Sequence, residues 1–265
     1  MPATLDETLQ PLREDPARTG VLCDVDGTLA PIAERPEDAA VPDETRELLE
    51  RLAERYALVA CVSGRRALDA RRLVAVEGIT YVGNHGLERA LPGEDEPRPD
   101  PALDGHEADA AAFIAGIGEK ELASVDIRVE DKGAIQALHW RGARNEGEAE
   151  SHAHEIASDA EWRGLRARWG RKVLEIRPPL RIGKGDAIAE LLGGAGAGRA
   201  LYGGDDLTDV EAFLYLRKLR DGELLETAVC VGVASSEGPP ELREAADLMV
   251  DGTEGFTEVL RELAA

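Results

Sequence analysis

Basic residues, aromatic residues and cysteines are scarce in this chain of 265 residues. Lysine and arginine number 31 against 53 aspartates and glutamates, which gives a formal net charge of −22. So acidic a protein lacks the basic face that nucleic-acid phosphates require, and it is disfavoured on anionic membranes. No apolar run approaches the roughly 18 residues that a membrane-spanning helix needs. We therefore expect neither a nucleic-acid partner nor a membrane.

The three cysteines, Cys23, Cys61 and Cys230, each lie inside an apolar run. Their odd number and wide separation favour buried thiols on strands over a disulfide or a metal site. The acidic N-terminal residues 1–18 lack the apolar core of a signal peptide. These features predict a protein of the reducing cytoplasm. Because aromatics make up only 4% of the chain, Leu, Val, Ile and Ala must form most of its core.

Short apolar runs alternate with helical patterns along much of the chain. Six runs are continuously apolar, as strands covered on both faces are. They are 21–25, 57–63, 79–83, 200–203, 228–233 and 248–250. Helices are expected at about 43–55, 65–76, 186–192, 209–220, 239–246 and 255–264. This order predicts an α/β fold with a doubly wound, Rossmann-like parallel sheet, which binds ligands beyond the carboxyl ends of its strands.

Residues 88–179 interrupt this alternation. The segment begins with a connector rich in proline and acidic residues, followed by two helical patterns and three strand-like runs. These are the connector 89–104, helices at about 106–123 and 146–168, and strands at 125–130, 134–141 and 172–178. The first two strands are joined by the hairpin turn 131–133. We expect a smaller α+β cap domain over 88–179, inserted into a core formed by 1–87 and 180–265.

In the inserted segment, Glu175 lies between Leu174 and Ile176 and must face away from both of them on a strand. An open face of the sheet would suit a carboxylate that accepts hydrogen bonds from sugar hydroxyls. Trp140, Trp162 and Trp169 are expected in the core of the insert rather than as platforms for sugar rings.

Two acidic motifs follow strand ends. They are DVDGT, with Asp24 and Asp26, and GGDDLTD, with Asp205, Asp206 and Asp209. The first is explained equally well by a turn, and Asp209 also suits the first turn of a helix. If Asp24 and Asp205 meet, their repulsion is about 4 kcal/mol at 4 Å and an effective dielectric of 20. A cation must offset this repulsion, and hard oxygen ligands without nearby His or Cys indicate Mg²⁺.

Two further polar motifs have weaker meaning alone. Ser63, Gly64 and Arg65 follow the strand at 57–63, and Lys184 enters a helix. A hydroxyl and an ammonium at such places can hold phosphoryl oxygens. Taken singly, however, Ser63 is more typical of a helix N-cap and Lys184 of a solvated surface.

In this order, the four motifs resemble those of the haloacid dehalogenase superfamily. The resemblance implies that Asp24 attacks phosphorus to form an aspartyl-phosphate, while Asp26 serves as general acid and then as base for water. It also implies Mg²⁺ held by Asp24, the backbone carbonyl of Asp26, and Asp205. The site residues so implied are catalytic Asp24, Asp26, Ser63 and Lys184, substrate-binding Gly64 and Arg65, and metal-binding Asp24, Asp26, Asp205, Asp206 and Asp209.

Further segments narrow the resemblance to the trehalose-6-phosphate phosphatase family, over nearly the whole chain. They are GNHGLE at 83–88, EDKG at 130–133, LHWR at 138–141, KVLEIRP at 172–178 and GDDLTDVEAF at 204–213. The substrate-binding residues so implied are Asn84, His85 and Gly86 near the entrance, with Glu130, Lys132 and Glu175 of the insert on the sugar. The sequence departs from the family pattern at Gly183 and in TDVEAF, neither of which is assigned to catalysis.

The resemblance implies a cytoplasmic phosphomonoester hydrolase that converts trehalose 6-phosphate to trehalose and phosphate with Mg²⁺. It also implies functional coupling to a trehalose-6-phosphate synthase. Two alternatives stay open. Another cap-bearing sugar phosphatase, acting on sucrose phosphate or a glycosyl-glycerate phosphate, would share the core motifs. A non-catalytic binding module on the same fold would have no need of Asp24, Asp26, Lys184 and Asp205 together.

Overall fold

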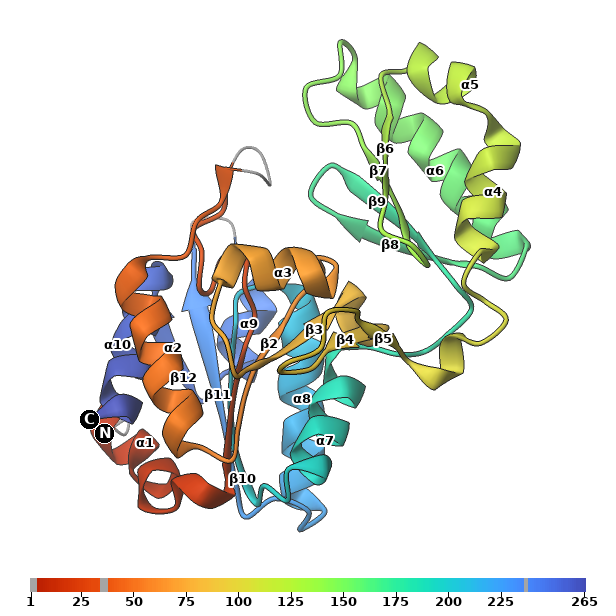
Figure 1. Cartoon of the computed structure of the whole chain (residues 1–265). Coiled ribbons are helices and arrows are strands. Elements are labelled where there is room, and N and C mark those ends of the chain that lie inside the picture. The colour runs from red at the N-terminus through yellow and green to blue at the C-terminus, as the bar shows by residue number, and fades with distance from the viewer. Residues whose placement is uncertain (1–3, 34–37, 236–237) are drawn as a thin grey trace. The chain divides into compact units, whose positions relative to one another are not determined.

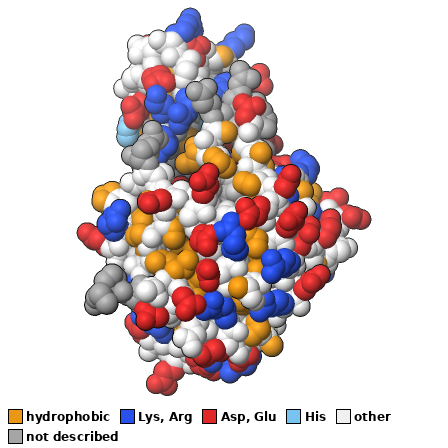
Figure 2. Space-filling model, turned by 90° about the vertical axis from the view of Figure 1, so that its left-hand side faces the viewer, with side chains coloured by type: hydrophobic (Ala, Val, Ile, Leu, Met, Phe, Trp, Pro, Cys, Tyr) orange, Lys and Arg blue, Asp and Glu red, His pale blue; other side chains and the backbone are white. Residues whose placement is uncertain are grey.

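The computed structural model describes residues 4–33, 38–235 and 238–265, which form two compact units. The first unit comprises the chain up to Arg98 and from Ile182 onward, and the second is Pro99–Arg181. Among the described residues, no helix is long and apolar enough to cross a membrane. Acidic and basic side chains lie intermixed on the face of the molecule that Figure 2 displays.

A central sheet organises the first unit (Figure 1). Its parallel strands are β1 (Thr19–Cys23), β2 (Leu58–Val62), β3 (Thr80–Gly83), β10 (Arg199–Gly204), β11 (Thr227–Ala234) and β12 (Leu248–Asp251). They lie in the order β12-β11-β10-β1-β2-β3, and β4 (Glu88–Ala90) and β5 (Arg98–Pro99) extend the sheet. All six strands predicted from the apolar runs are present.

Helices cover both faces of this sheet, so the predicted doubly wound α/β fold is confirmed. One face packs on α1 (Leu5–Glu14), α2 (Asp43–Arg55), α3 (Ala67–Val74) and α10 (Gly252–Ala264). The other packs on α7 (Lys184–Gly194), α8 (Leu207–Asp221) and α9 (Pro240–Ala245). Helix α1 was not predicted, although Thr4 and Glu7 form a capping box at its start.

The order of the strands reverses between β1 and β10, where the chain leaves in opposite directions. These strands run parallel and in register, with Cys23 beside Gly203, and the Asp24 amide donates to the Gly203 carbonyl at 2.9 Å. Ligands of open α/β sheets bind at such a switch point, beyond the carboxyl ends of the strands. The two acidic motifs emerge from these two strands.

The second unit has its own antiparallel sheet with helices on one face. Its strands are β6 (Arg128–Asp131), β7 (Gln136–His139), β9 (Val173–Arg177) and β8 (Arg166–Gly170), in that order across the sheet. Helices α4 (Asp109–Ile117), α5 (Glu119–Ser124) and α6 (Glu146–Trp162) share a hydrophobic core with the sheet. Leu174 and Ile176 point into that core.

Several boundaries differ from those expected. The second unit begins at Pro99 rather than at 88, because Glu88–Ala90 pairs with β3. The helix expected at 106–123 is divided at Gly118, whose φ of 91° is not helical. The helix expected to reach 168 ends at Trp162, and the chain turns into β8.

The prediction for the tryptophans is right in part. Trp140 belongs to the core of the second unit, as expected. The prediction is wrong for Trp162, which lies at the end of α6 and is 84% exposed. Trp169 is 40% exposed and stacks on His154.

Substitution of Gly203 tests the packing of β10 against α10, because a Cβ at this position would overlap the ring of Phe256. We expect Gly203→Ala to lower the free energy of unfolding by about 1–3 kcal/mol through overpacking. Gly193→Ala, near the end of α7 with nothing close to the new Cβ, should leave stability unchanged or raise it. Circular dichroism is the appropriate probe, because all three tryptophans lie in the second unit. Equal stabilities of the two variants would contradict this account of the packing.

Candidate active site

A buried lysine forms the centre of the site. Lys184 is the first residue of α7 and is only 3% exposed. Its Nζ donates to Oδ1 of Asp24 at 2.6 Å and to Oδ1 of Asp209 at 2.7 Å. A buried ammonium needs such partners, since the desolvation of an unpaired charge is very costly. Lys184 therefore joins the loop after β1 to the first turn of α8.

Two aspartates at the start of α8 accept hydrogen bonds from different backbone amides. Asp206 is the N-cap, and its Oδ1 accepts hydrogen bonds from the amides of Thr208 and Asp209. Asp209 is fully buried, and its Oδ2 accepts from the amides of Asp205 and Asp206. Its Oδ1 accepts from Lys184 and from the hydroxyl of Tyr202, the latter at 2.6 Å. Asp209 thus has four protein donors.

The buried charges shift one another's titration. Burial raises the pKa of Asp24 well above its usual range, against the opposing effect of Lys184. Burial also raises the pKa of Asp205, with Asp209 and Asp206 adding to the shift, to about 8. The pKa of Lys184 is raised although burial alone would lower it, because Asp209 and Asp24 stabilise the ammonium. If all its carboxyls were ionised, the cluster would carry more negative charge than Lys184 can balance.

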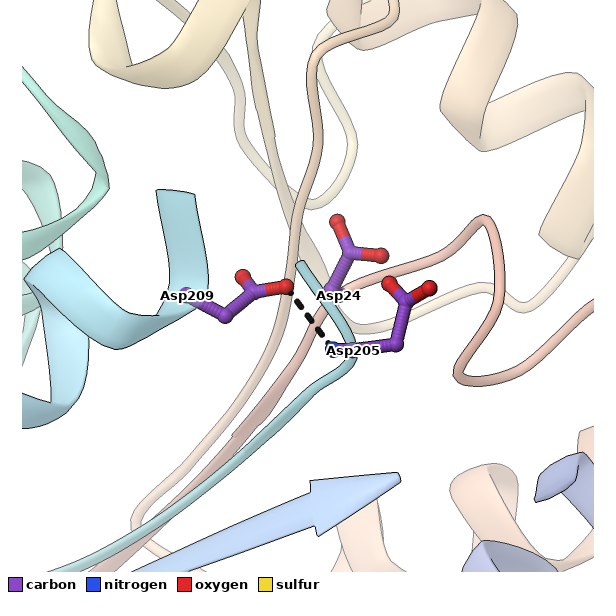
Figure 3. Close-up of side chains that lie close together, drawn as sticks. All are labelled: Asp24, Asp205 and Asp209. Atoms are coloured by element: carbon purple, nitrogen blue, oxygen red, sulfur yellow. Dashed lines mark hydrogen bonds between the residues drawn. The ribbon is translucent and has the colours of Figure 1, made fainter. Parts of the chain in front are cut away.

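Three carboxylates of this cluster could hold a metal ion (Figure 3). Asp24, Asp205 and Asp209 each present an oxygen, and these oxygens lie within 4.8 Å of one another. Asp209 is already saturated by its four donors. The Asp205 side chain accepts no hydrogen bond from any described residue, and the second oxygen of Asp24 is not bound by Lys184. Buried oxygens of this kind fit a hard divalent cation such as Mg²⁺.

Gly27 allows the first loop to pass close to Asp205. Its φ is 88°, and a Cβ on it would overlap the Asp205 carboxylate. The glycine of DVDGT is therefore needed both for its backbone conformation and for space.

The loops after β2 and β3 interlock beside the first loop. The Ser63 hydroxyl accepts from the Arg65 amide at 3.1 Å, while the His85 amide donates to the Ser63 carbonyl. Arg65 holds Asp26 through two bonds of 2.7 Å, from Nε to Oδ2 and from Nη2 to Oδ1. Asn84 and His85 both have positive φ, of 50° and 58°. Strained backbone of this kind is frequently found at functional sites.

The other predicted loop residues also lie among these loops. A Cβ on Gly64 would approach Nε2 of His85 to 2.7 Å, and one on Gly86 would approach the Gly183 carbonyl to 2.9 Å. The turn 84–86 therefore packs between the loop after β2 and the residue that precedes Lys184.

A second polar cluster lies on the sheet of the second unit. Glu175, only 8% exposed, accepts from Lys132 Nζ at 3.1 Å and from Arg177, whose Nε lies 3.0 Å away. Glu130 accepts from His139 Nε2 at 2.8 Å, and this hydrogen bond lowers the pKa of Glu130. These side chains combine carboxylate acceptors with cationic donors on one small surface, as recognition of a polyol requires.

The structure thus divides the predicted residues between two clusters. Asp24, Lys184, Asp205 and Asp209 meet at the switch point, whereas Asp26 pairs with Arg65 and Asp206 caps α8. Glu130, Lys132 and Glu175 gather in the second unit. Sequence reasoning missed Tyr202, whose place on a buried strand gave no sign of a polar contact. It also missed Arg177, although two residues after Glu175 on a strand it must share that residue's face.

Comparison with known proteins is consistent with this geometry. The sequence model of the trehalose-phosphatase family matches residues 22–246. The chain belongs to this family. It is 33% identical over 258 residues to a trehalose 6-phosphate phosphatase of Zea mays, covering 91% of this chain and 68% of the other. It is 35% identical over 209 residues to a trehalose-phosphate phosphatase of Mycobacterium avium, covering 73% of this chain and 50% of the other.

Other relatives are longer, and solved structures share the fold. A Mycobacterium tuberculosis protein described as an uncharacterized glycosyl hydrolase is 37% identical over 206 residues. The match covers 74% of this chain but only 15% of that protein. The C-terminal domain of Candida albicans trehalose-6-phosphate phosphatase superposes with a TM-score of 0.77 at 20% identity, covering 99% of this chain and 97% of that domain.

The raised pKa of Asp205 predicts that chelator-treated protein loses stability as pH rises. A carboxyl group whose pKa is lowered by folding would have the opposite effect. Folded Asp205 keeps its proton to about pH 8, whereas an unfolded aspartate loses it near pH 4. Because the folded state binds more protons in between, stability should fall as pH rises through this window. A Mg²⁺ ion on the ionised carboxylate would restore stability increasingly at higher pH.

Differential scanning calorimetry from pH 5 to about pH 8.5, with EDTA or with Mg²⁺, measures this effect. Asp205→Asn should flatten the slope seen in EDTA and reduce the stabilisation by Mg²⁺. A wild-type Tm that rises with pH in EDTA would contradict the assignment.

Proposed function

We propose that this chain hydrolyses trehalose 6-phosphate to trehalose and phosphate, with Mg²⁺ at the carboxylate cluster. One observation carries the proposal: buried Lys184 joins Asp24 to Asp209 at the switch point of the sheet, beside the carboxylate of Asp205. This cluster can bind and polarise a phosphoryl group. The trehalose ester is suggested by the names of the relatives from Zea mays and Mycobacterium avium.

Asp24 is the nucleophile in this proposal. One carboxylate oxygen of Asp24 attacks phosphorus while the bond from phosphorus to the sugar oxygen breaks. The product is an aspartyl-phosphate. Attack by water on its phosphorus then releases phosphate and restores the carboxylate. Dividing one difficult displacement into two easier ones is the general advantage of covalent catalysis.

Asp26 moves the protons. It gives one to the departing sugar oxygen and later takes one from the attacking water. Because Arg65 holds both oxygens of Asp26, Asp26 must exchange this partner for the leaving oxygen before it can donate a proton. The guanidinium of Arg65 can then pair with phosphoryl oxygens, which its fork of donors suits well.

Asp24 and Asp205 would hold the Mg²⁺ ion, with Asp26 contributing its backbone carbonyl. When bound, the ion would neutralise charge on the transferring phosphoryl group. Lys184 adds a fixed positive charge to the same cluster. Asp209 holds Lys184 and the amides of residues 205 and 206 in place, and so acts through other groups.

Phosphate and sugar are bound by separate groups in this proposal. Ser63, Gly64 and the turn 84–86 bind the phosphate end. Glu130, Lys132 and Glu175 of the second unit bind hydroxyls of the disaccharide, which makes that unit the specificity domain. A site that hydrogen-bonds a substrate hydroxyl rejects an analogue lacking it strongly, because buried polar groups are left unpaired. Arg177 orients the carboxylate of Glu175, and His139 orients that of Glu130.

We further propose that the enzyme works in the cytoplasm and is coupled in function to a synthase that makes trehalose 6-phosphate. The buried charge cluster disfavours the alternative that this chain is a non-catalytic binding module. Such a cluster carries a desolvation cost that a scaffold does not need.

The function is tested by phosphate release from trehalose 6-phosphate, with Mg²⁺ and with EDTA, beside glucose 6-phosphate, sucrose 6-phosphate and a glycosyl-glycerate phosphate. We expect a strong, metal-dependent preference for the trehalose ester. Metal-dependent release from another sugar phosphate would keep the chemistry and overturn the substrate. No release from any of them would favour a binding role.

Asp24→Asn tests the nucleophile. The amide keeps the size of the side chain and an oxygen for ligands but is a far poorer nucleophile. We expect turnover to fall below about 1% of wild type while trehalose 6-phosphate still binds, as measured by calorimetry with Mg²⁺. Lys172→Gln, a change in an exposed hairpin of the second unit, is the control and should leave turnover near wild type. Retention of turnover by Asp24→Asn would exclude Asp24 as the nucleophile.

A further inference from the structure

Tyr202 lies beneath the active-site cluster, and its hydroxyl is directed at it. It is fully buried in β10 and donates to Oδ1 of Asp209 at 2.6 Å. Its ring packs edge-on against Phe213, with centroids 5.8 Å apart. The hydroxyl therefore connects the sheet to the first turn of α8.

The hydroxyls of two other buried tyrosines have different partners. Tyr56 donates to the backbone carbonyl of Leu263 and Tyr81 to that of Val76. Both of those acceptors are backbone groups. Tyr202 instead donates to a side chain that also holds Lys184. A purely structural tyrosine has no need of that acceptor.

The acceptor sites of Asp209 explain what the hydroxyl does. A carboxylate offers about four lone-pair positions. Lys184 and Tyr202 occupy those of Oδ1, and the amides of Asp205 and Asp206 occupy those of Oδ2. With all four filled, the carboxylate has one orientation. Removal of one donor would let it turn, which would move Lys184 and loosen the backbone that carries Asp205.

We propose that Tyr202 is a positioning residue of the phosphatase site, which fixes Asp209 and through it Lys184 and Asp205. This inference rests on the proposed function, because Lys184 and Asp205 matter only if phosphoryl transfer and cation binding occur there. Partners of this outer kind commonly change metal affinity or activity by 10- to 100-fold when they are removed.

Tyr202→Phe tests the proposal with the smallest possible change, because the ring and its packing on Phe213 remain. We expect kcat to fall by about tenfold or more, with KM for trehalose 6-phosphate within about twofold of wild type. Mg²⁺ binding to the substrate-free protein, measured by calorimetry, should weaken by about tenfold. Tyr56→Phe loses one buried hydrogen bond, and Tyr81→Phe loses two, because the Tyr81 hydroxyl both donates to and accepts from the backbone of Val76. They should lower Tm comparably and leave both kcat and Mg²⁺ affinity unchanged.

Failure of the inference and of the proposed function can be told apart. If wild type hydrolyses p-nitrophenyl phosphate but not trehalose 6-phosphate, the same comparison is made with that ester. If it hydrolyses neither, the calorimetric comparison with Mg²⁺ alone still decides. A folded Tyr202→Phe variant with wild-type kcat and Mg²⁺ affinity would overturn the inference, as would equal losses in all three variants.

A spectroscopic measurement covers the case in which Tyr202→Phe does not fold. The chain has four tyrosines, so labelling with 3-fluorotyrosine gives four ¹⁹F resonances. Tyr56→Phe and Tyr81→Phe, with Tyr215→Phe, assign three of them and leave Tyr202 as the fourth. We expect the Tyr202 resonance to shift on addition of Mg²⁺ while those of Tyr56 and Tyr81 stay. An unmoved Tyr202 resonance at saturating Mg²⁺ would count against the inference.

Discussion

An excess of buried carboxyl groups around one ammonium is the constraint on which the site depends. Asp24 and Asp209 are bridged by Lys184 and lie beside Asp205, and burial raises the pKa of each of these carboxyls. Two carboxylates of this cluster remain available after the protein's own donors are counted. A hard cation fits such a site, and a phosphate ester is a ligand that both the cation and Lys184 would attract.

The fold produces this cluster from strand order. Because β1 and β10 are neighbours in register, the residues that follow Cys23 and Gly203 emerge side by side. Helices α7 and α8 then begin within reach, which places Lys184 and Asp209 at their first turns. Tyr202 donates a hydrogen bond to Asp209, and Gly27 leaves room for the carboxylate of Asp205. In the proposed function, the second unit recognises the sugar through its separate polar cluster.

Sequence predicted the sheet and the place of the acidic motifs at its strand ends better than it predicted the insert. Apolar runs and the residues after them are local signals, so the six parallel strands and the acidic motifs could be found directly. The pairing of residues 88–90 with β3 depends on a tertiary contact. The helical sequence pattern continues past Trp162, so it gives no sign of the turn that ends α6 there. The partners of Asp26 and Asp209 could not be found either. Arg65 lies in the loop after β2 and Tyr202 in β10, and only folding shows which donors fill which carboxylate oxygens.

The central claim, that Asp24 receives the phosphoryl group, is tested most directly by trapping the intermediate. Enzyme turning over trehalose 6-phosphate with Mg²⁺ would be quenched in acid, digested with pepsin at low pH and analysed by mass spectrometry. The account predicts a phosphoryl group on the peptide that contains Asp24, absent with EDTA and absent in Asp24→Asn. Phosphorylation of another residue, or rapid hydrolysis with no phosphorylated peptide at any quench time, would contradict it.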